Sequence, residues 1–390
     1  MNSIKDKACI TGIGETTYSK SSGMSTTALI LQASTRAISD AGLKNGDIDG
    51  VVAPFLGASS YELGASLGIR DLKWAVTVQM GGASSVAAIM NAAMAVATGV
   101  CRHVLVPIGW NGYSGTRVSK DMATGPELTL PMADRSRDYE YPYGCFVPAQ
   151  WYSQICLRHM HTYGTTHDHL GAISVTMRRH AQFNSNSQMK GKTMTIEDYH
   201  NSRWVSYPYH LFDCCLETDG AAACVVSSAE AAGDMPNVPV SVIGAGTGHS
   251  YPADDIANRP DMLHIGLADA APRAFQMAGV TPKDMDFAMI YDCFTFEVLH
   301  QIEAIGFCGE GEGGPWLDGG RRISWPDGEV PVNTHGGLLS QGHVIGMNHV
   351  CEAVKQLRGT SEAQVKNAQL GLVTGWGDYG DGSIIIVRRV

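Results

Sequence analysis

Features of nucleic-acid-binding and membrane proteins are missing from this chain of 390 residues. It has no run rich in lysine and arginine, and its formal net charge is −10. We expect no nucleic-acid partner, because binding to phosphates requires clustered cations. Residues 1–13 contain no apolar stretch long enough for a signal peptide or a membrane helix. We therefore expect a cytoplasmic protein with no membrane partner.

Cysteine spacing typical of metal sites is also missing. The ten cysteines are scattered along the chain, and none forms a Cys-x-x-Cys pair. His159, His161, His167 and His169 include no i, i+4 pair, so we expect them on a polar surface or at an interface. The sequence therefore predicts no metal in this chain, no covalently bound cofactor, and reduced thiols that lie mostly in the core.

Composition and apolar patterning favour a layered α/β protein. Hydrophobic residues make up 44% of the chain and charged residues 17%, which is ordinary for a globular protein large enough for two domains. Apolar runs at residues 104–108, 222–226 and 384–387 read as strands, and they alternate with helical segments. This alternation predicts an α/β fold.

An internal repeat indicates two similar halves. Residues 27–52 read as an amphipathic helix, a glycine turn, an acidic pair and an apolar strand, and residues 267–290 repeat that order. The offset is constant, since 278 − 41 = 237 for the alanines before the turn glycines and 286 − 49 = 237 for the aspartates before the strands. In both copies glycine supplies the left-handed turn that ends the helix.

A polar turn at residues 233–236 predicts the boundary between the halves. The N-terminal half then spans residues 1–235, and the C-terminal half spans residues 236–390. A loop excursion is expected at about residues 110–215, because residues 110–143 are rich in glycine, proline and charge. The excursion either covers a site or an interface, or it is an ordinary surface insertion.

The stretch between residues 333 and 349 carries the most chemistry. It reads Asn333-Thr-His-Gly-Gly-Leu-Leu-Ser-Gln-Gly-His343-Val-Ile-Gly-Met-Asn-His349. Two glycines and a Gly-His pair lie between an apolar strand-like run and a helix, an arrangement that presents an imidazole on a rigid backbone. The pattern predicts a reactive loop.

This stretch resembles the Asn-x-x-Gly-Gly … Gly-His-Pro signature of the thiolase superfamily. Its matches are Asn333, Gly336, Gly337, Gly342 and His343, and Val344 stands where the family usually has proline. Tyr291-Asp292-Cys293-Phe294 is similar to the His-Asp-Cys-Phe motif of the sterol-carrier-protein-thiolase-like branch, and Asp213-Cys214-Cys215 is also family-like. The resemblance extends over nearly the whole chain. It implies a thiolase fold, with two similar halves forming a five-layered α-β-α-β-α core, usually as a dimer.

The chain departs from that family at the nucleophile. Thiolases carry a reactive cysteine at the start of a buried helix, where helix polarity lowers its pKa. Here Gly82 stands at that position, within Gln79-Met-Gly-Gly-Ala-Ser-Ser85. The second family cysteine is also absent, because Val373-Thr-Gly-Trp-Gly377 occupies its stretch. An acyl-enzyme cannot form at residue 82.

The resemblance implies roles for the residues that remain. His343 and the backbone N–H groups of Gly82 and Gly375 would form oxyanion holes. Cys293 would transfer protons, or be an inert buried thiol, and Tyr291 would donate a hydrogen bond or act as acid or base on a substrate hydroxyl. Four further residues are expected to shape the site loop instead of reacting: Asn333, His335, Gly336 and Gly337.

Three functions remain open, each on a coenzyme A thioester as substrate. The main expectation is retro-Claisen thiolysis of a bulky, possibly aromatic β-ketoacyl-CoA, with either Cys293 or coenzyme A itself attacking the ketone. The first alternative is retro-aldol cleavage of a β-hydroxyacyl-CoA, which needs no thiol. The second alternative is a non-catalytic scaffold subunit.

Similar family members include steroid side-chain aldolases and the benzoylsuccinyl-CoA thiolase. Both work with a small OB-fold zinc-ribbon partner subunit, so the resemblance implies such a partner beside a homodimer core. The aldolases tend to have tyrosine where this chain has His343. For that reason the sequence favours thiolysis narrowly over the aldol reaction.

Overall fold

The computed structural model describes residues 3–115, 117, 136–252, 259–377 and 380–390. A nine-stranded sheet forms its centre, in the order β3-β2-β4-β7-β1-β8-β11-β10-β9. The strands of this sheet are β1 (Ala8–Glu15), β2 (Gly50–Pro54), β3 (Trp74–Val78), β4 (His103–Asn111), β7 (Asp219–Ser228), β8 (Val240–Gly248), β9 (Phe287–Met289), β10 (Leu370–Gly377) and β11 (Asp381–Arg389).

The strand order reads the same outward from the β1–β8 junction. β7 and β4 follow β1 with antiparallel pairing, and β11 and β10 follow β8 in the same way. β2 then pairs parallel with β4, as β9 does with β10. The bridge from Ala288 to Val332 is parallel, as is the pairing of β3 with β2. Two similar halves are therefore present, as the internal repeat predicts.

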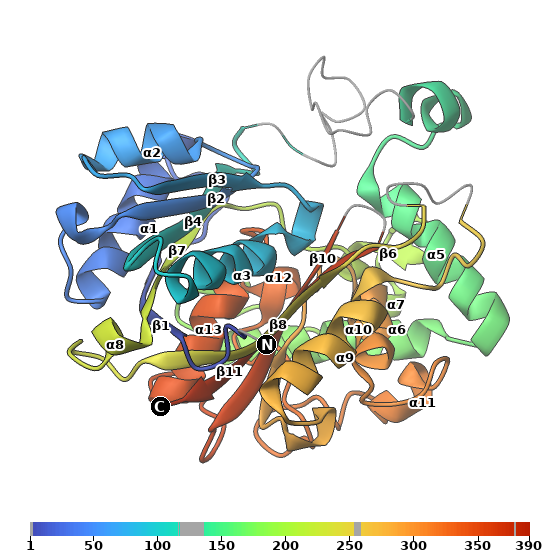
Figure 1. The fold of residues 1–390 in the computed structure, drawn as a ribbon. Coiled ribbons are helices and arrows are strands. Elements are labelled where there is room, and N and C mark those ends of the chain that lie inside the picture. Colours follow the sequence, from blue (N-terminus) through green and yellow to red (C-terminus); the bar gives the residue numbers. More distant parts are fainter. Residues whose placement is uncertain (1–2, 116, 118–135, 253–258, 378–379) are drawn as a thin grey trace.

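Helices separate and cover the two halves (Figure 1). They are α1 (Thr26–Asp40), α2 (Ser60–Leu67), α3 (Ser84–Ala97), α5 (Pro148–Tyr163), α6 (His167–His180), α7 (Ile196–His200), α8 (Ala229–Ala232), α9 (Gly266–Ala278), α10 (Thr295–Ile305), α11 (Gly313–Leu317), α12 (Gly337–Ser340) and α13 (Met347–Arg358). α3 packs on β2 and β4 of the first half and on β10 and β11 of the second, beside α13. α1 covers the outer face of the first half and α9 that of the second. The two halves of the sheet therefore form two β layers with α3 and α13 between them, and the order of the layers is α-β-α-β-α.

The sequences of these helices explain their layers. Nine of the 14 residues of α3 are alanine, valine or isoleucine, and nearly every residue of α13 is buried. A helix that is apolar on all sides is stable only between two packed layers. α1 and α9 bury one face each, and each ends in a glycine of positive φ, Gly42 at 71° and Gly279 at 74°. The predicted repeat therefore extends to the backbone of the turn.

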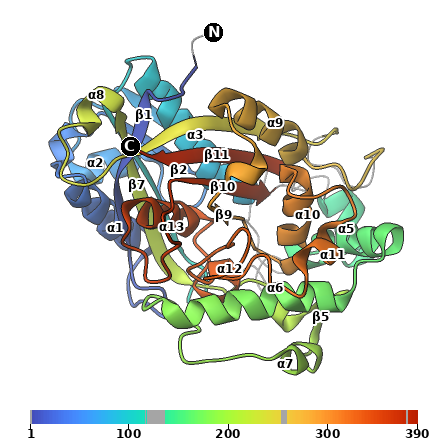
Figure 2. The same cartoon turned by 90° about the horizontal axis from the view of Figure 1, so that it is seen from below.

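The excursion expected at residues 110–215 is largely a helical lobe. α5, α6 and α7 belong to it, together with a hairpin of β5 (Trp204–Ser206) and β6 (Tyr209–His210). Figure 2 shows α6 along one side of the molecule, with α12 next to it. Residues 118–135 of the excursion lie outside the described residues. The boundary near residue 235 stays a prediction; it falls between α8 and β8.

Within the described part of the chain, no helix is both long enough and apolar enough to cross a membrane.

Candidate active site

His343 is held at four points. It lies between α12 and α13, where its backbone N–H donates to Thr218 Oγ1 at 2.9 Å and its carbonyl accepts from the Trp110 indole N–H at 2.8 Å. Its ring lies with Nε2 3.0 Å from the Tyr291 hydroxyl and Nδ1 3.7 Å from Cys215 Sγ. Burial, followed by the charge of His349, lowers the pKa of His343 to about 3. At neutral pH the ring is therefore an uncharged imidazole.

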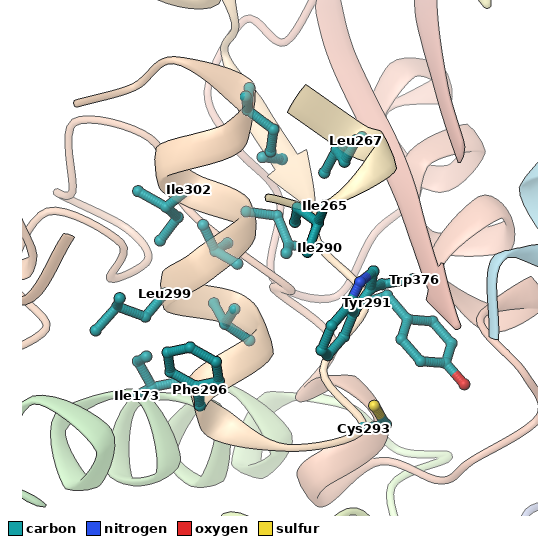
Figure 3. Close-up of a cluster of buried hydrophobic side chains, with 14 of the residues drawn as sticks. Ile173, Ile265, Leu267, Ile290, Tyr291, Cys293, Phe296, Leu299, Ile302 and Trp376 are labelled. Atoms are coloured by element: carbon teal, nitrogen blue, oxygen red, sulfur yellow. The ribbon is translucent and has the colours of Figure 1, made fainter. Parts of the chain in front are cut away.

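Tyr291 is positioned by the backbone that leaves β9. The Asn333 side chain accepts from the Ile290 N–H at 2.8 Å and donates to the Ile290 carbonyl at 2.7 Å. Gln301 donates to the Tyr291 carbonyl at 2.7 Å. In Figure 3 the phenol oxygen of Tyr291 points away from the apolar cluster beside α10. Burial raises the pKa of Tyr291 well above its usual value, so the phenol is protonated at neutral pH.

The Tyr291 ring occupies the space that a side chain at residue 82 would need. Gly82 lies in a short turn, Gly81–Ala83, which leads into α3. A Cβ at Gly82 would lie 2.4 Å from Tyr291 Cζ and 2.2 Å from the Trp376 carbonyl oxygen. Contacts that short do not occur between real Cβ atoms and their neighbours. On this backbone the Trp376 carbonyl and the Tyr291 ring therefore both exclude a side chain at residue 82.

The turn that carries Gly82 lies directly against β10. A Cβ at Gly375 would lie 2.7 Å from Ala83 Cα, and one at Gly377 would lie 2.2 Å from the Gly82 nitrogen. Both positions on β10 therefore require glycine. The structure brings the predicted oxyanion residues Gly82 and Gly375 together, while the role of their N–H groups stays a prediction.

The Gly-Gly turn of the site loop holds a buried carboxylate. The N–H groups of Leu338 and Leu339 donate to Asp292, at 2.8 and 3.3 Å. Gly337 has φ +64°, and a Cβ there would lie 2.0 Å from Asp292 Oδ2. Gly336, with φ +102°, packs against Ala181 in the same turn. Both glycines are needed for the turn to approach its neighbours.

Two further histidines, His349 and His335, lie in sequence beside the Asp292 carboxylate. His349 Nε2 lies 3.1 Å from Asp292 Oδ1, at an angle that gives no hydrogen bond, and its Nδ1 lies 3.0 Å from His335 Nε2. Burial lowers the pKa of His335 well below its usual value, so it is uncharged. His335 therefore packs against His349 beneath the protein surface, and its role in shaping the site stays a prediction.

Cys293 is buried next to Tyr291, as Figure 3 shows, with 8% of the residue exposed. Burial, followed by the charge of Glu297, raises the pKa of its thiol well above the usual value. Across from it, the Cys215 N–H donates to the Cys293 carbonyl at 2.9 Å. In the described part of the chain, the thiol that contacts His343 belongs to Cys215.

Sequence reasoning assigned no role to Cys215, Thr218 or Trp110. The motif at residues 213–215 marked the segment as family-like, but only the folded chain brings it to His343. The surface expectation for the four histidines is wrong for His159. It is fully buried, and its Nε2 lies 3.1 Å from Glu303 Oε2.

Within the described ranges, no group of three or more His, Cys, Asp or Glu residues is arranged to hold a metal ion.

Comparisons with known proteins identify relatives of this chain. The family model of the thiolase C-terminal domain-like family matches residues 248–389. Over 385 residues the chain is 37% identical to the steroid side-chain-cleaving aldolase of Thermomonospora curvata, covering 96% of both chains. It is also 37% identical to the 17-hydroxy-3-oxo-4-pregnene-20-carboxyl-CoA lyase of Mycobacterium tuberculosis, covering 95% of this chain and 96% of the other.

A solved structure titled Ltp2-ChsH2(DUF35) aldolase superposes on this chain with a TM-score of 0.91. The two are 35% identical, and the match covers 99% of this chain and 98% of the other.

Proposed function

Because the chain belongs to the thiolase superfamily, in its sterol-carrier-protein-thiolase-like branch, we propose that it is a retro-aldolase. It would cleave the Cα–Cβ bond of a β-hydroxyacyl-CoA, giving a ketone or aldehyde and a shorter acyl-CoA. The observation that carries this proposal is the phenol of Tyr291, which fills the side-chain space at Gly82 and lies 3.0 Å from His343 Nε2. A phenol–imidazole pair thus stands where a thiolase keeps its nucleophile.

The pair can remove the proton from a substrate hydroxyl. Tyr291 is protonated at rest, so it cannot accept a proton until it loses its own. His343 is uncharged and can take that proton at Nε2 as the substrate hydroxyl proton moves to the Tyr291 oxygen. The O–H electrons then form the new C=O bond, and the Cα–Cβ electrons move onto the thioester as an enolate. The enolate finally takes up a proton at Cα.

Backbone N–H groups would stabilise the negative charge on the thioester oxygen by donating hydrogen bonds to it. Both ring nitrogens of His343 face protein groups, Tyr291 and Cys215. The ring is therefore better placed for proton transfer than for donating to an oxyanion. The touching backbones of Gly82 and Gly375 are the donors that we assign to the enolate oxygen.

Thiolysis, the main expectation from the sequence, has less support. The two relatives that are 37% identical to this chain are named as an aldolase and a lyase. Burial raises the pKa of Cys293 and of Cys215, which makes a thiolate nucleophile scarce at neutral pH. The sequence favoured thiolysis because the aldolases tend to have tyrosine where this chain has His343. Our proposal does not require that tyrosine, because Tyr291 and His343 act as a pair.

One assay separates the two reactions. The coenzyme A thioester named for the Mycobacterium tuberculosis relative is incubated with the enzyme, and so is a β-ketoacyl-CoA of similar bulk, each with and without free coenzyme A. We expect the β-hydroxy substrate to be cleaved with no coenzyme A consumed. Cleavage of the β-keto substrate alone, dependent on coenzyme A, would reject the aldol proposal in favour of thiolysis. No turnover of either probe would favour the scaffold alternative.

We also propose a small OB-fold zinc-ribbon partner subunit and a homodimeric core. The support for the partner subunit is the solved relative, whose title names a DUF35 component beside the aldolase. The homodimeric core is what the family resemblance implies. Co-expression of this chain with a small DUF35 protein from the same genome, followed by size-exclusion chromatography with light scattering, is the test. We expect a stable complex with raised activity. A chain that is fully active alone and binds no such protein would reject the partner.

A further inference from the structure

Two thiols flank the Tyr291–His343 pair, and their surroundings differ. Cys215 Sγ lies 3.7 Å from His343 Nδ1, within hydrogen-bond reach for sulfur. Cys293 lies directly across from Cys215, is almost completely buried, and makes no such contact in the described part of the chain. Cys215 is partly exposed. The geometry therefore connects one particular thiol to the catalytic imidazole.

The chain holds Cys215 firmly in this place. Its N–H donates to the Cys293 carbonyl at 2.9 Å, and the following residue, Leu216, donates to the Leu338 carbonyl at 3.0 Å. On its other side, Cys214 forms an antiparallel bridge with Phe294. Backbone bonds therefore fix the thiol between the Tyr291 segment and α12, and its approach to His343 does not depend on a mobile loop.

We propose that Cys215 is the third member of a proton relay with His343 and Tyr291, and that its thiol protonates Cα of the acyl-CoA enolate. This inference rests on the retro-aldol function proposed above. A thiol–imidazole–phenol arrangement with these distances links a proton donor on one side of the ring to a proton acceptor on the other.

The protons of this relay balance. The substrate hydroxyl proton moves to the Tyr291 oxygen, and the Tyr291 proton moves to His343 Nε2. The proton on His343 Nδ1 moves to Cys215 Sγ while the S–H proton of Cys215 forms the new C–H bond at Cα. Tyr291 and Cys215 end in their starting forms. His343 ends with its proton on Nε2 and returns to the Nδ1 form by exchange with water between turnovers.

The surroundings of Cys215 suit an acid. Burial, followed by the charges of Asp292 and Glu217, raises the pKa of its thiol. The group therefore stays protonated at neutral pH, which a proton donor requires and a nucleophile does not. Cys215 is by the same reasoning a poor acceptor of an acyl group.

Hydrogen exchange at Cα isolates this step. The full-length chain, with any subunit that co-purifies, is incubated with propionyl-CoA in D₂O, and deuterium at the α carbon is measured by mass spectrometry. This half-reaction needs proton transfer at Cα but no β-hydroxyl. We expect Cys215→Ala to slow both exchange and cleavage by about 100-fold or more. Cys308→Ala, which removes another partly exposed free thiol, is the matched control and should leave both rates unchanged.

Further variants decide between the possible outcomes. Tyr291→Phe should lower cleavage by about 10²–10⁴-fold but keep exchange. Exchange needs only Cys215 and His343 with its proton on Nε2: the Cα proton moves to Sγ while the S–H proton moves to Nδ1, and the reverse step returns a deuteron to Cα. Cys215→Ser keeps a side chain of similar size and a hydrogen bond to His343. Slow exchange in a folded Cys215→Ser enzyme would show that the acidity of the thiol, and not its packing, is needed for the step. Normal exchange in Cys215→Ala, or loss of exchange in Cys293→Ala alone, would overturn the relay.

The wild-type enzyme supplies the last distinction. An enzyme that cleaves the β-hydroxyacyl-CoA but does not exchange the α hydrogens would overturn the relay and leave the proposed function intact. A failure of cleavage itself would count against the proposed function instead.

Discussion

The phenol ring of Tyr291 lies where the side chain of residue 82 would otherwise be, with Tyr291 Cζ 2.4 Å from an ideal Cβ on Gly82. The Tyr291 ring can occupy this position only because residue 82 has no side chain. With glycine at residue 82, the phenol has room to lie 3.0 Å from His343 Nε2. A cysteine at residue 82 would therefore overlap the Tyr291 ring and the Trp376 carbonyl.

The first prediction concerns residue 82. Gly82→Ala should lower the free energy of unfolding by about 1–3 kcal/mol or more, because the new methyl group overlaps the Tyr291 ring and the Trp376 carbonyl. It should also lower cleavage, because the phenol moves away from His343. Urea unfolding and kcat/KM measure the two effects. Gly46→Ala is the control, since a Cβ there meets nothing within 4 Å. Equal stability of the two variants would contradict the packing argument.

Sequence reasoning predicted a candidate site but not the contacts within it. The motifs at residues 291–294 and 333–343 identified Tyr291, Cys293 and His343, because each motif marks its own segment. The internal repeat likewise predicted the halves, since a helix, a glycine turn and a strand are local features. Contacts between segments are different. The Tyr291 ring at Gly82 and the Cys215 thiol at His343 depend on how distant segments pack. Buried His159 was missed for the same reason.

The second prediction removes one hydroxyl. Tyr291→Phe keeps the ring in its place at Gly82, so the fold should be retained. Retro-aldol cleavage should fall by about 10²–10⁴-fold, because the base on the substrate hydroxyl is lost. Steady-state kinetics on the β-hydroxyacyl-CoA give kcat and KM separately, and we expect the loss mainly in kcat. A folded variant with normal kcat would remove Tyr291 from the mechanism.

The third prediction replaces the imidazole. His343→Ala should lower the cleavage rate by a factor on the order of 100 to 1000, because the proton transfer from Tyr291 depends on the ring. Circular dichroism and thermal unfolding check that the fold is retained. An unchanged rate in a folded variant would show that His343 takes no part in the reaction.

The fourth prediction concerns stability in acid. Burial lowers the pKa of His343 to about 3 and that of His180 and His300 to about 4, all below the value of about 6.5 in an unfolded chain. The unfolded chain therefore binds more protons at mildly acidic pH. The stability contributed by these uncharged rings is fully present above about pH 6.5 and is lost as the pH falls toward 4 and then 3.

Each of these histidines should steepen the loss by about 1.4 kcal/mol per pH unit in that window. Asp213 acts in the opposite direction, because burial raises its pKa to about 6, and it offsets about one histidine. Urea midpoints between pH 4 and 8 measure the slope. His300→Gln, which can still donate to the Leu263 carbonyl, should flatten the slope by about one proton. The same slope in that variant would contradict this assignment.

The fifth prediction tests whether Asn333 acts through Tyr291. Its side chain makes two hydrogen bonds to Ile290, and its backbone has φ 49°, a conformation that alanine adopts only with strain. Asn333→Ala should therefore lose about 2–4 kcal/mol of stability, from two buried hydrogen bonds and the backbone strain. Asn333→Gly removes the hydrogen bonds without the strain, so it should be the milder of the two.

Activity distinguishes a positioning role from a purely structural one. In folded Asn333→Gly the backbone before Tyr291 loses its anchor, so the phenol should spend less time 3.0 Å from His343. We expect kcat to fall by about 10-fold or more while KM changes little, because a positioning defect acts on the reacting geometry and not on binding. If folded Asn333→Gly keeps its full kcat, the anchor serves only the stability of the loop.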